Sequence, residues 1–150
     1  MEIVTLNADE VWRMADCMER LAAHHNAIPA PFSGLYPVVP IALQLEKFAH
    51  AVAAGIARVT ALVDGDDTPG ICKTSWEASR ACVDLLYVRD ELRGQGWGRR
   101  LFEEQLAFLR GRDVALIDIL VVLGNDAKGF YEQYGFSVRT QILGLKNHNA

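Results

Sequence analysis

The chain has 150 residues, of which 51% are apolar and 23% charged, and its formal net charge is −4 at pH 7. These values predict one globular domain over residues 1–150 and exclude a disordered chain. The negative charge argues against non-specific nucleic-acid binding. No stretch approaches the ~18 apolar residues of a membrane span, and the N-terminus lacks the basic start of a signal peptide. We therefore expect a cytoplasmic protein that does not engage a membrane.

The three cysteines, Cys17, Cys72 and Cys82, agree with a reducing compartment. Their number is odd and they form no Cys-x-x-Cys pair, which is unlike a disulfide framework or a zinc site. His24 and His25 are adjacent, which is poor spacing for two ligands on one helix face. We expect no bound metal.

The N-terminal region predicts a strand followed by a helix. Residues 1–6 are short and β-prone. Asn7 is a good N-cap, and Glu10 follows three residues later as in a capping box. Apolar residues then recur at helical spacing, so the pattern predicts a helix from Asn7 to about His25.

Two proline-containing segments come next. Residues 26–37 form a loop with three prolines and two aromatic residues, and this loop connects the first two helices. Pro40 occupies a favoured first-turn position of a second helix, which Gly55 ends. An aromatic loop restrained by prolines can act as a lid over a site or can simply pack against the sheet, and both roles stay open for its aromatic residues.

The middle of the chain predicts an antiparallel meander. Residues 56–64, 71–76 and 82–88 are strand-like and close together in sequence. Residues 65–70 are dense in turn residues and predict a hairpin loop between the first two of these strands.

The C-terminal half changes pattern. We expect an amphipathic helix ending near Gly111, a strand over 114–122 covered on both faces, a helix over 126–134 and a final strand over 136–145. Strand, helix and strand between about 82 and 122 predict a parallel, right-handed crossover. The order β-α-α-β-β-β-α-β-α-β predicts a single mixed, mainly antiparallel sheet of α/β or α+β class.

A glycine-rich turn lies between the 82–88 strand and the next helix. Three alternate glycines, Gly94, Gly96 and Gly98, leave backbone N–H groups uncovered at a helix start, where an anion is favoured. Arg93, Arg99 and the adjacent Arg100 add positive charge that suits phosphate oxygens. The turn therefore predicts a pyrophosphate site.

Two common nucleotide motifs do not fit this turn. The dinucleotide pattern needs a third glycine where Arg99 stands, and it normally follows the first strand of a domain. A Walker P-loop needs Gly-Lys-Ser or Gly-Lys-Thr, which is absent. The spacing therefore disfavours an NAD-dependent oxidoreductase.

The same turn resembles the acetyl-CoA signature of the GNAT acetyltransferase superfamily, and a second motif follows at the matching separation. The resemblance covers about residues 81–140. The residues that carry it are Arg93, Gly96 and Gly98 in the pattern Arg-x-x-Gly-x-Gly, the strand run Leu85-Leu86-Tyr87-Val88, then Asn125-Asp126-Ala127 and the run Gly129-Phe130-Tyr131-Glu132-Gln133-Tyr134-Gly135-Phe136.

The resemblance implies a GNAT-like fold in which two central parallel strands splay apart and pantetheine lies in the wedge between them. Backbone groups of the first strand would pair with pantetheine, and an N–H near Val88 would polarise the thioester carbonyl. The cofactor-binding residues that it implies are Leu86, Tyr87, Val88, Arg93, Gly94, Gln95, Gly96, Trp97, Gly98, Arg99, Asn125 and Tyr131.

The resemblance also assigns chemistry. Tyr131 matches the tyrosine that protonates the departing CoA thiolate, and its alternative is a core aromatic between helix and sheet. Many relatives place a glutamate base where this chain has Cys82. Asp84 lies two residues later, on the strand face predicted for Cys82, Leu86 and Val88. Asp84 then acts as the proton acceptor or as a carboxylate satisfied at a strand edge, and both interpretations stay open.

Two further residues have open roles. Asp118 lies within an apolar run, where an unpaired charge would be costly. It either lines the acceptor cleft with Asp84, which would favour a cationic amine, or is a hydrogen-bonded structural carboxylate. Asn125 binds cofactor, caps a helix, or does both.

The function implied by the resemblance is an acetyl-CoA-dependent N-acetyltransferase. It would move an acetyl group from its cosubstrate acetyl-CoA to a primary amine of a small molecule or peptide, by direct attack on the thioester. The alternative is a non-catalytic acyl-CoA-binding or sensor module, which the departure at Cys82 keeps open. The expected partners are acetyl-CoA, an amine acceptor and, as in many similar proteins, a second copy in a homodimer.

Overall fold

A five-stranded mixed sheet organises the protein, in a computed structural model that describes residues 1–147. The strands lie in chain order; β1 to β4 are antiparallel neighbours, and β5 pairs with β4 in parallel. The mixed α+β class is therefore confirmed. The strands are β1 (Glu2–Leu6), β2 (Ala57–Asp64), β3 (Asp67–Glu77), β4 (Arg80–Val88) and β5 (Leu116–Ile119).

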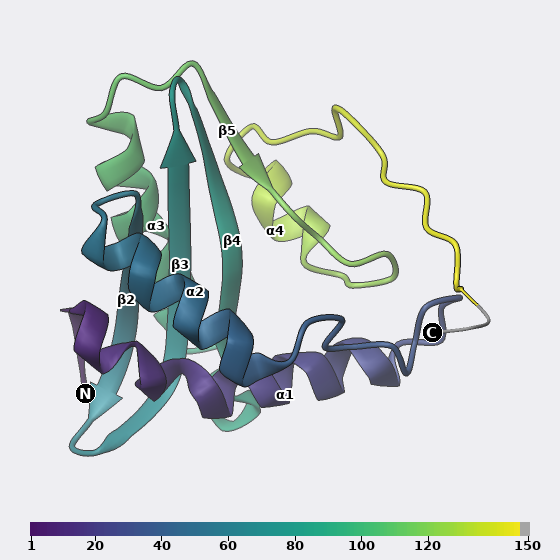
Figure 1. Cartoon of the computed structure of the whole chain (residues 1–150), viewed down its shortest axis with the longest axis horizontal. Coiled ribbons are helices and arrows are strands. Elements are labelled where there is room, and N and C mark those ends of the chain that lie inside the picture. Colours follow the sequence, from purple (N-terminus) through teal and green to yellow (C-terminus); the bar gives the residue numbers. More distant parts are fainter. Residues whose placement is uncertain (148–150) are drawn as a thin grey trace.

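Helices cover both faces of the sheet. Figure 1 shows α1 and α2 crossing one face, with α3 on the opposite face and α4 beside the end of β5. The helices are the 3₁₀ helix η1 (Ala8–Met14), α1 (Ala15–Ala27), α2 (Ile41–Ala53), the 3₁₀ turn η2 (Asp90–Leu92), α3 (Trp97–Arg110) and α4 (Lys128–Glu132). Within residues 1–147, no helix combines the length and apolar character that crossing a membrane requires.

Each face of the sheet has its own core. The core under η1, α1 and α2 includes Leu6, Val11, Met14, Cys17, Val59, Ile71 and Tyr87. The core under α3 and α4 includes Leu62, Cys72, Val83, Val88, Leu101, Phe102, Leu106 and Tyr131. Burial of these side chains is the main favourable contribution to folding.

A buried glutamine holds α3 to the sheet. The side chain of Gln105 is fully buried and donates from Nε2 to the carbonyl oxygens of Cys72, at 2.9 Å, and Arg58, at 3.0 Å. Its Oε1 accepts from Thr74 Oγ1 at 3.0 Å and from the Arg58 guanidinium at 3.2 Å. Since every polar atom of this amide has a partner, its burial costs little and it fixes the helix that begins at the glycine turn.

The first helix differs from its prediction, because it begins as seven residues of 3₁₀ helix before α1 starts. Val11 and Met14 lie three residues apart and are both buried, which suits a turn of three residues. The predicted capping residue is in place: Glu10 Oε1 accepts from the Asn7 N–H at 3.0 Å.

The predicted hairpin loop over 65–70 is too long. The turn consists of Gly65, at φ +61, and Asp66, and β3 already begins at Asp67. Gly70 therefore lies inside a strand, where an added Cβ would approach Leu101 Cδ1 to 3.2 Å. Gly70 allows α3 to pack close to the sheet. Sequence composition alone does not distinguish a glycine in this role from a glycine in a turn.

The C-terminal predictions are the least accurate. β5 has four residues instead of nine and is partly exposed, so the expectation of cover on both faces is wrong. α4 has five residues, and residues 136–145 form no strand. Phe136 packs against the core, but the later apolar side chains of this segment stay in solvent, Ile142 at 84% and Leu143 at 94% exposed. Strand propensity alone does not form a strand without a paired neighbour.

Candidate active site

The two parallel strands part after four residue pairs. Pairing runs from Arg80 opposite Leu116 to Val83 opposite Ile119, and within residues 1–147 no later pair joins β4 to β5. Figure 1 shows β5 diverging from β4 on its way to α4. The backbone of β4 beyond Val83 therefore has no β5 partner on this side, which is the arrangement that an added strand-like ligand needs.

A β-bulge lies where the strands part. Thr74 pairs with Val83 and Lys73 with Leu85, so Asp84 is the extra residue on β4. One extra residue reverses the alternation of side chains that follow it. The prediction that Asp84 shares a face with Leu86 and Val88 is therefore wrong.

The two cores show this reversal directly. Val83, Leu86 and Val88 pack in the core under α3, whereas Leu85 and Tyr87 pack in the core under α1 and α2. The Asp84 side chain consequently lies at the change of face, and its carboxylate reaches Lys73 on the α2 side of the sheet.

Asp84 has a buried cation as its partner. Lys73 Nζ lies 2.6 Å from Asp84 Oδ2 and 4.2 Å from the centre of the Phe48 ring on α2. The Lys73 side chain is 6% exposed and that of Asp84 is 23% exposed. Lys73 therefore satisfies the Asp84 carboxylate, as in the structural interpretation. Part of the Asp84 side chain still faces solvent, so the role of proton acceptor also stays open.

Cys82 is a poor nucleophile in this position. Burial, followed by the neighbouring Asp84 carboxylate, raises the pKa of the Cys82 thiol to about 12. The thiol is protonated at neutral pH, whereas thioester attack needs the thiolate. An acyl-enzyme on Cys82 is therefore disfavoured, in agreement with the sequence-based expectation of direct attack.

The glycine turn has the backbone shape that its sequence indicates. Gly94 and Gly96 have φ of +79 and +86, a conformation that costs other residues energy. Gly96 is the N-cap of α3, so the helix begins at Trp97 and its first N–H groups have no carbonyl partner within the helix. A Cβ at Gly98 would lie 3.7 Å from Val88 Cγ2, which is an ordinary contact.

The arginines of the turn bind protein groups. Arg93 Nε donates to the Val88 carbonyl at 3.1 Å, which ties the turn to the end of β4. Arg99 Nη1 donates to the Tyr134 hydroxyl at 3.1 Å and its Nη2 to Gln133 Oε1 at 3.3 Å. These contacts connect the turn to the strand on one side and to the end of the second motif on the other.

Tyr131 is buried in the core under α3 and α4. Its ring centroid lies 5.4 Å from that of the fully buried Phe102 and 5.2 Å from that of Phe130, both in edge-on geometry. Tyr131 therefore packs as a core aromatic residue. Burial raises the pKa of the Tyr131 phenol, which keeps the group protonated at neutral pH. A protonated phenol can donate a proton, so packing and acid catalysis are compatible in this residue.

Asn125 connects two loops. Its Oδ1 accepts from the Ala127 N–H at 3.0 Å, two residues along the chain, which closes the turn before α4. This bond sets the amide orientation, so Nδ2 faces His25 Nε2 at 3.3 Å and that ring nitrogen is the acceptor. The N-cap of α4 is Ala127, so Asn125 is not the helix cap that the sequence indicated; it closes the preceding turn and bridges to α1.

Of the two roles left open for Asp118, the contacts favour that of a hydrogen-bonded structural carboxylate. It accepts from Arg139 Nε at 2.5 Å and from Arg80 Nε at 2.7 Å, and its side chain is 12% exposed. The Arg139 hydrogen bond lowers the pKa of Asp118 to about 2, with a smaller contribution from Arg80. With Asp84 and Asp118 both paired to cations, their proposed joint attraction for a cationic amine loses its support.

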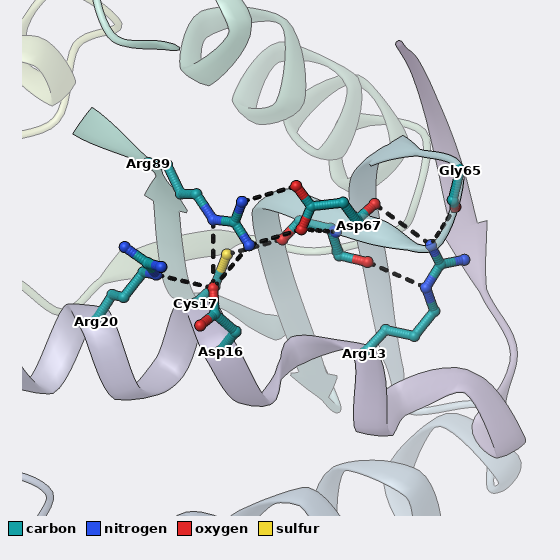
Figure 2. Close-up of polar contacts among 8 residues, drawn as sticks. Arg13, Asp16, Cys17, Arg20, Gly65, Asp67 and Arg89 are labelled. Atoms are coloured by element: carbon teal, nitrogen blue, oxygen red, sulfur yellow. Dashed lines mark hydrogen bonds and ion pairs between the residues drawn. The ribbon is translucent and has the colours of Figure 1, made fainter. Parts of the chain in front are cut away.

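A second polar network fixes the chain just before the turn. Arg89 follows β4 directly and binds Asp67 of the β2–β3 hairpin and Asp16 of α1, as Figure 2 shows. On the same hairpin, Arg13 donates to Thr68 Oγ1 and to the Gly65 carbonyl, both at 3.0 Å. Sequence reasoning missed this network because its members lie up to 73 residues apart and form no motif.

The described residues contain no group of side chains that would form a metal centre. In the described part of the chain, no three His, Cys, Asp or Glu side chains converge on a point where they could hold a metal ion. The geometry of the turn and the parted strands instead suits an elongated phosphate-bearing molecule.

Comparison with known proteins identifies the family of this domain. A model of the acetyltransferase (GNAT) domain matches residues 50–138, which is more than half of the chain. The chain therefore belongs to the GNAT acetyltransferase domain family. No curated protein sequence matches it.

Several solved structures share the fold. A mutant form of a Bacillus halodurans protein has a TM-score of 0.74 at 19% identity, covering 98% of this chain and 100% of that one. A predicted acetyltransferase from Clostridium acetobutylicum, solved with acetyl-CoA, has a TM-score of 0.75 at 13% identity and coverage of 97% and 95%. The PaiA N-acetyltransferase of Thermoplasma acidophilum, in complex with coenzyme A, has a TM-score of 0.69 at 14% identity and coverage of 95% and 94%.

Proposed function

We propose that the chain transfers an acetyl group from acetyl-CoA to a primary amine of a small molecule or peptide. One observation carries the proposal: the strand that parts from its parallel neighbour after Val83 runs directly into the glycine turn at the start of α3. A phosphate-binding helix start thus lies at the end of a strand with open hydrogen-bonding groups. Acetyl-CoA has both matching parts, a pyrophosphate and a peptide-like pantetheine.

The proposed binding roles belong mostly to the backbone. N–H groups from Gly94 to Arg99 bind the pyrophosphate, since the Arg93 N–H already donates to the Asp90 carbonyl at 3.1 Å. The backbone of Leu86, Tyr87 and Val88 pairs with pantetheine. Acetyl-CoA supplies the activated acyl group as a thioester. Asn125 contributes by closing the turn before α4, with its side chain as a further cofactor contact.

The proposed chemistry is direct acyl transfer. The amine nitrogen forms a bond to the acyl carbon, the carbon–sulfur bond breaks, and the electron pair leaves with sulfur. Asp84 takes the proton that the amine loses, directly or through water. Tyr131 donates a proton to the leaving thiolate. The Tyr131 phenol is protonated at neutral pH, as a proton donor has to be, and its burial also makes it a weaker acid than a free phenol.

Calorimetric titration of acetyl-CoA, with CoA and NAD alongside, tests the binding half of the proposal. We expect micromolar acetyl-CoA affinity in the wild type and a loss of at least about tenfold in Gly98→Glu, because a carboxylate at the turn repels phosphate. Arg110→Gln is the matched control, since it changes the net charge equally at the other end of α3. Absence of acetyl-CoA binding by folded protein would contradict the proposal.

An amine screen that follows thiol release tests the catalytic half. We expect Tyr131→Phe to bind acetyl-CoA normally and to lower kcat by roughly 10²-fold, the usual contribution of a proton donor. Binding without thiol release for any amine would favour the alternative, a non-catalytic acyl-CoA-binding module. The cysteine at position 82, in place of a carboxylate, is the observation that supports this alternative.

A homodimer is a further part of the proposal. β5 lies at one end of the sheet in the described residues, and an edge strand is a surface on which a second chain can pair. Light scattering after size exclusion measures the mass in solution. A monomer at all protein concentrations would remove this part and leave the catalytic proposal intact.

A further inference from the structure

A lysine is buried in the middle of β3. Lys73 is 5% exposed, although lysine is rarely found inside a protein without a partner. Its ammonium group has two neighbours of suitable chemistry, Asp84 Oδ2 at 2.6 Å and the ring of Phe48 at 4.2 Å. Together these contacts join β3, the bulge of β4 and α2.

Stability alone does not account for this pair. A buried ion pair is often no better than two apolar side chains of similar volume, because both charges lose their hydration. The surroundings of Lys73 are apolar, with Phe48 and Leu85 packed against the same core. An apolar pair would fit this location, so the charged pair calls for a role beyond packing.

The location of the pair suggests that role. Asp84 is the bulged residue and the first on β4 after the last pair with β5. Its side chain is 23% exposed, so it stays accessible while the Lys73 side chain is 6% exposed. Lys73 therefore holds one oxygen of a carboxylate that stands where the strands part.

The structure assigns Lys73 as a positioning residue for the acyl transfer proposed above, on which this inference rests. Lys73 fixes the Asp84 carboxylate at the bulge, so that Asp84 meets the acceptor amine in one orientation. Phe48 limits the ammonium to that side of the bulge. Lys73 acts through Asp84 and does not itself contact the reacting atoms.

Four variants test the assignment: Lys73→Met, Asp84→Asn, the double variant that carries both changes, and Lys47→Met. Lys47 is exposed on α2 next to Phe48 and serves as the control for loss of a lysine. Each single change leaves one buried partner without the other and should destabilise the fold, whereas the double variant is a neutral pair of similar volume. Urea unfolding, acetyl-CoA affinity by calorimetry, and kcat for the best amine are measured for all four.

We expect the double variant to regain the urea midpoint of the wild type but not its kcat. Both single variants and the double variant should show kcat lower by roughly 10²-fold, with acetyl-CoA affinity within about twofold of wild type. Lys47→Met should match wild type in all three measurements. Recovery of kcat together with stability in the double variant would overturn the assignment, because the pair would then serve folding only.

Two other outcomes also decide the matter. If the losses of kcat in the single variants multiply in the double variant, Lys73 acts independently of Asp84 and the assignment is wrong. If the wild type acetylates no amine, the proposed function fails and the assignment fails with it. Wild-type turnover with an unchanged kcat in the folded Lys73→Met variant overturns the assignment alone.

Discussion

Arg89 holds Asp67 with two nitrogens at once: Nη1 lies 2.7 Å from Oδ2 and Nη2 lies 2.6 Å from Oδ1. The same guanidinium reaches Asp16 on α1 at 2.9 Å (Figure 2). Arg89 directly follows β4, so these ion pairs connect α1 and the β2–β3 hairpin to the end of the strand that leads into the glycine turn. A planar fork on a carboxylate gives direction as well as attraction.

Arg89→Gln should lower the free energy of unfolding by about 1–2 kcal/mol, more than an isolated surface pair, because one side chain joins three elements. Arg20→Gln is the control: Arg20 is half exposed and binds Asp16 from the same helix, so its loss should lower the urea midpoint much less than the loss of Arg89. Urea titration of both variants measures the difference. Equal losses would show that the bidentate contact adds nothing.

Asp118 should make stability depend on pH at the acid end. The pKa of this carboxyl is about 2 in the folded protein, against an ordinary value of 3.8, so folding favours the charged form. The stabilisation is complete above about pH 4 and is lost as the pH falls through about 2. The difference in urea midpoint between wild type and Asp118→Asn should therefore be constant near neutral pH and shrink between about pH 4 and 2.

Asp113→Asn is the matched control, because Asp113 is exposed in the loop before β5. A gap between wild type and Asp118→Asn that persists unchanged at about pH 2 would mean that the contacts with Arg139 and Arg80 do not stabilise the charged carboxylate.

His25 should make stability depend on pH closer to neutrality. Burial, with a smaller effect of His24, lowers the pKa of His25 below 6.5, so the folded protein favours the neutral ring that accepts from Asn125. The unfolded chain binds the proton more readily, so stability should fall as the pH drops below about 6.5. The slope for one proton is at most about 1.4 kcal/mol per pH unit.

His25→Gln should remove this slope between about pH 7 and 5, and His50→Gln, an exposed change on α2, should keep it. Thermal unfolding across this range measures the effect. A wild-type curve that is flat here, or one whose slope survives in His25→Gln, would contradict the role of the neutral ring.

The sequence predicted those elements that depend on the spacing of residues within a short segment. The glycine turn, the helix after it and the meander of β2, β3 and β4 follow from spacing within a few residues. The bulge at Asp84 and the burial of Lys73 depend on cross-strand register, which one strand alone does not contain. The prediction that placed Asp84 with Leu86 and Val88 assumed unbroken alternation, and a single extra residue made it wrong.

The C-terminal region shows the other limit. Residues 136–145 have strand-like composition, but the contacts that the structure gives them are between side chains, such as Arg139 with Asp118 and Phe136 with Phe102. Backbone pairing requires a neighbour in the correct register, and apolar composition does not supply one. For the site, family resemblance named Tyr131 and the glycine turn, and the roles assigned to these residues stay predictions.

The bulge in β4 also determines how substitutions along that strand will be tolerated. Residues before Asp84 and after it have opposite phase, so an even spacing such as that from Cys82 to Leu86 joins positions on different sides of the sheet. Deleting Asp84 would restore regular alternation and leave Leu86 and Val88 facing α3, because Val83, Leu86 and Val88 already pack on that side. Mutational scanning of β4 should therefore show two separate periodic profiles that are offset by one residue, and a deletion at Asp84 should preserve the packing of the residues that follow it.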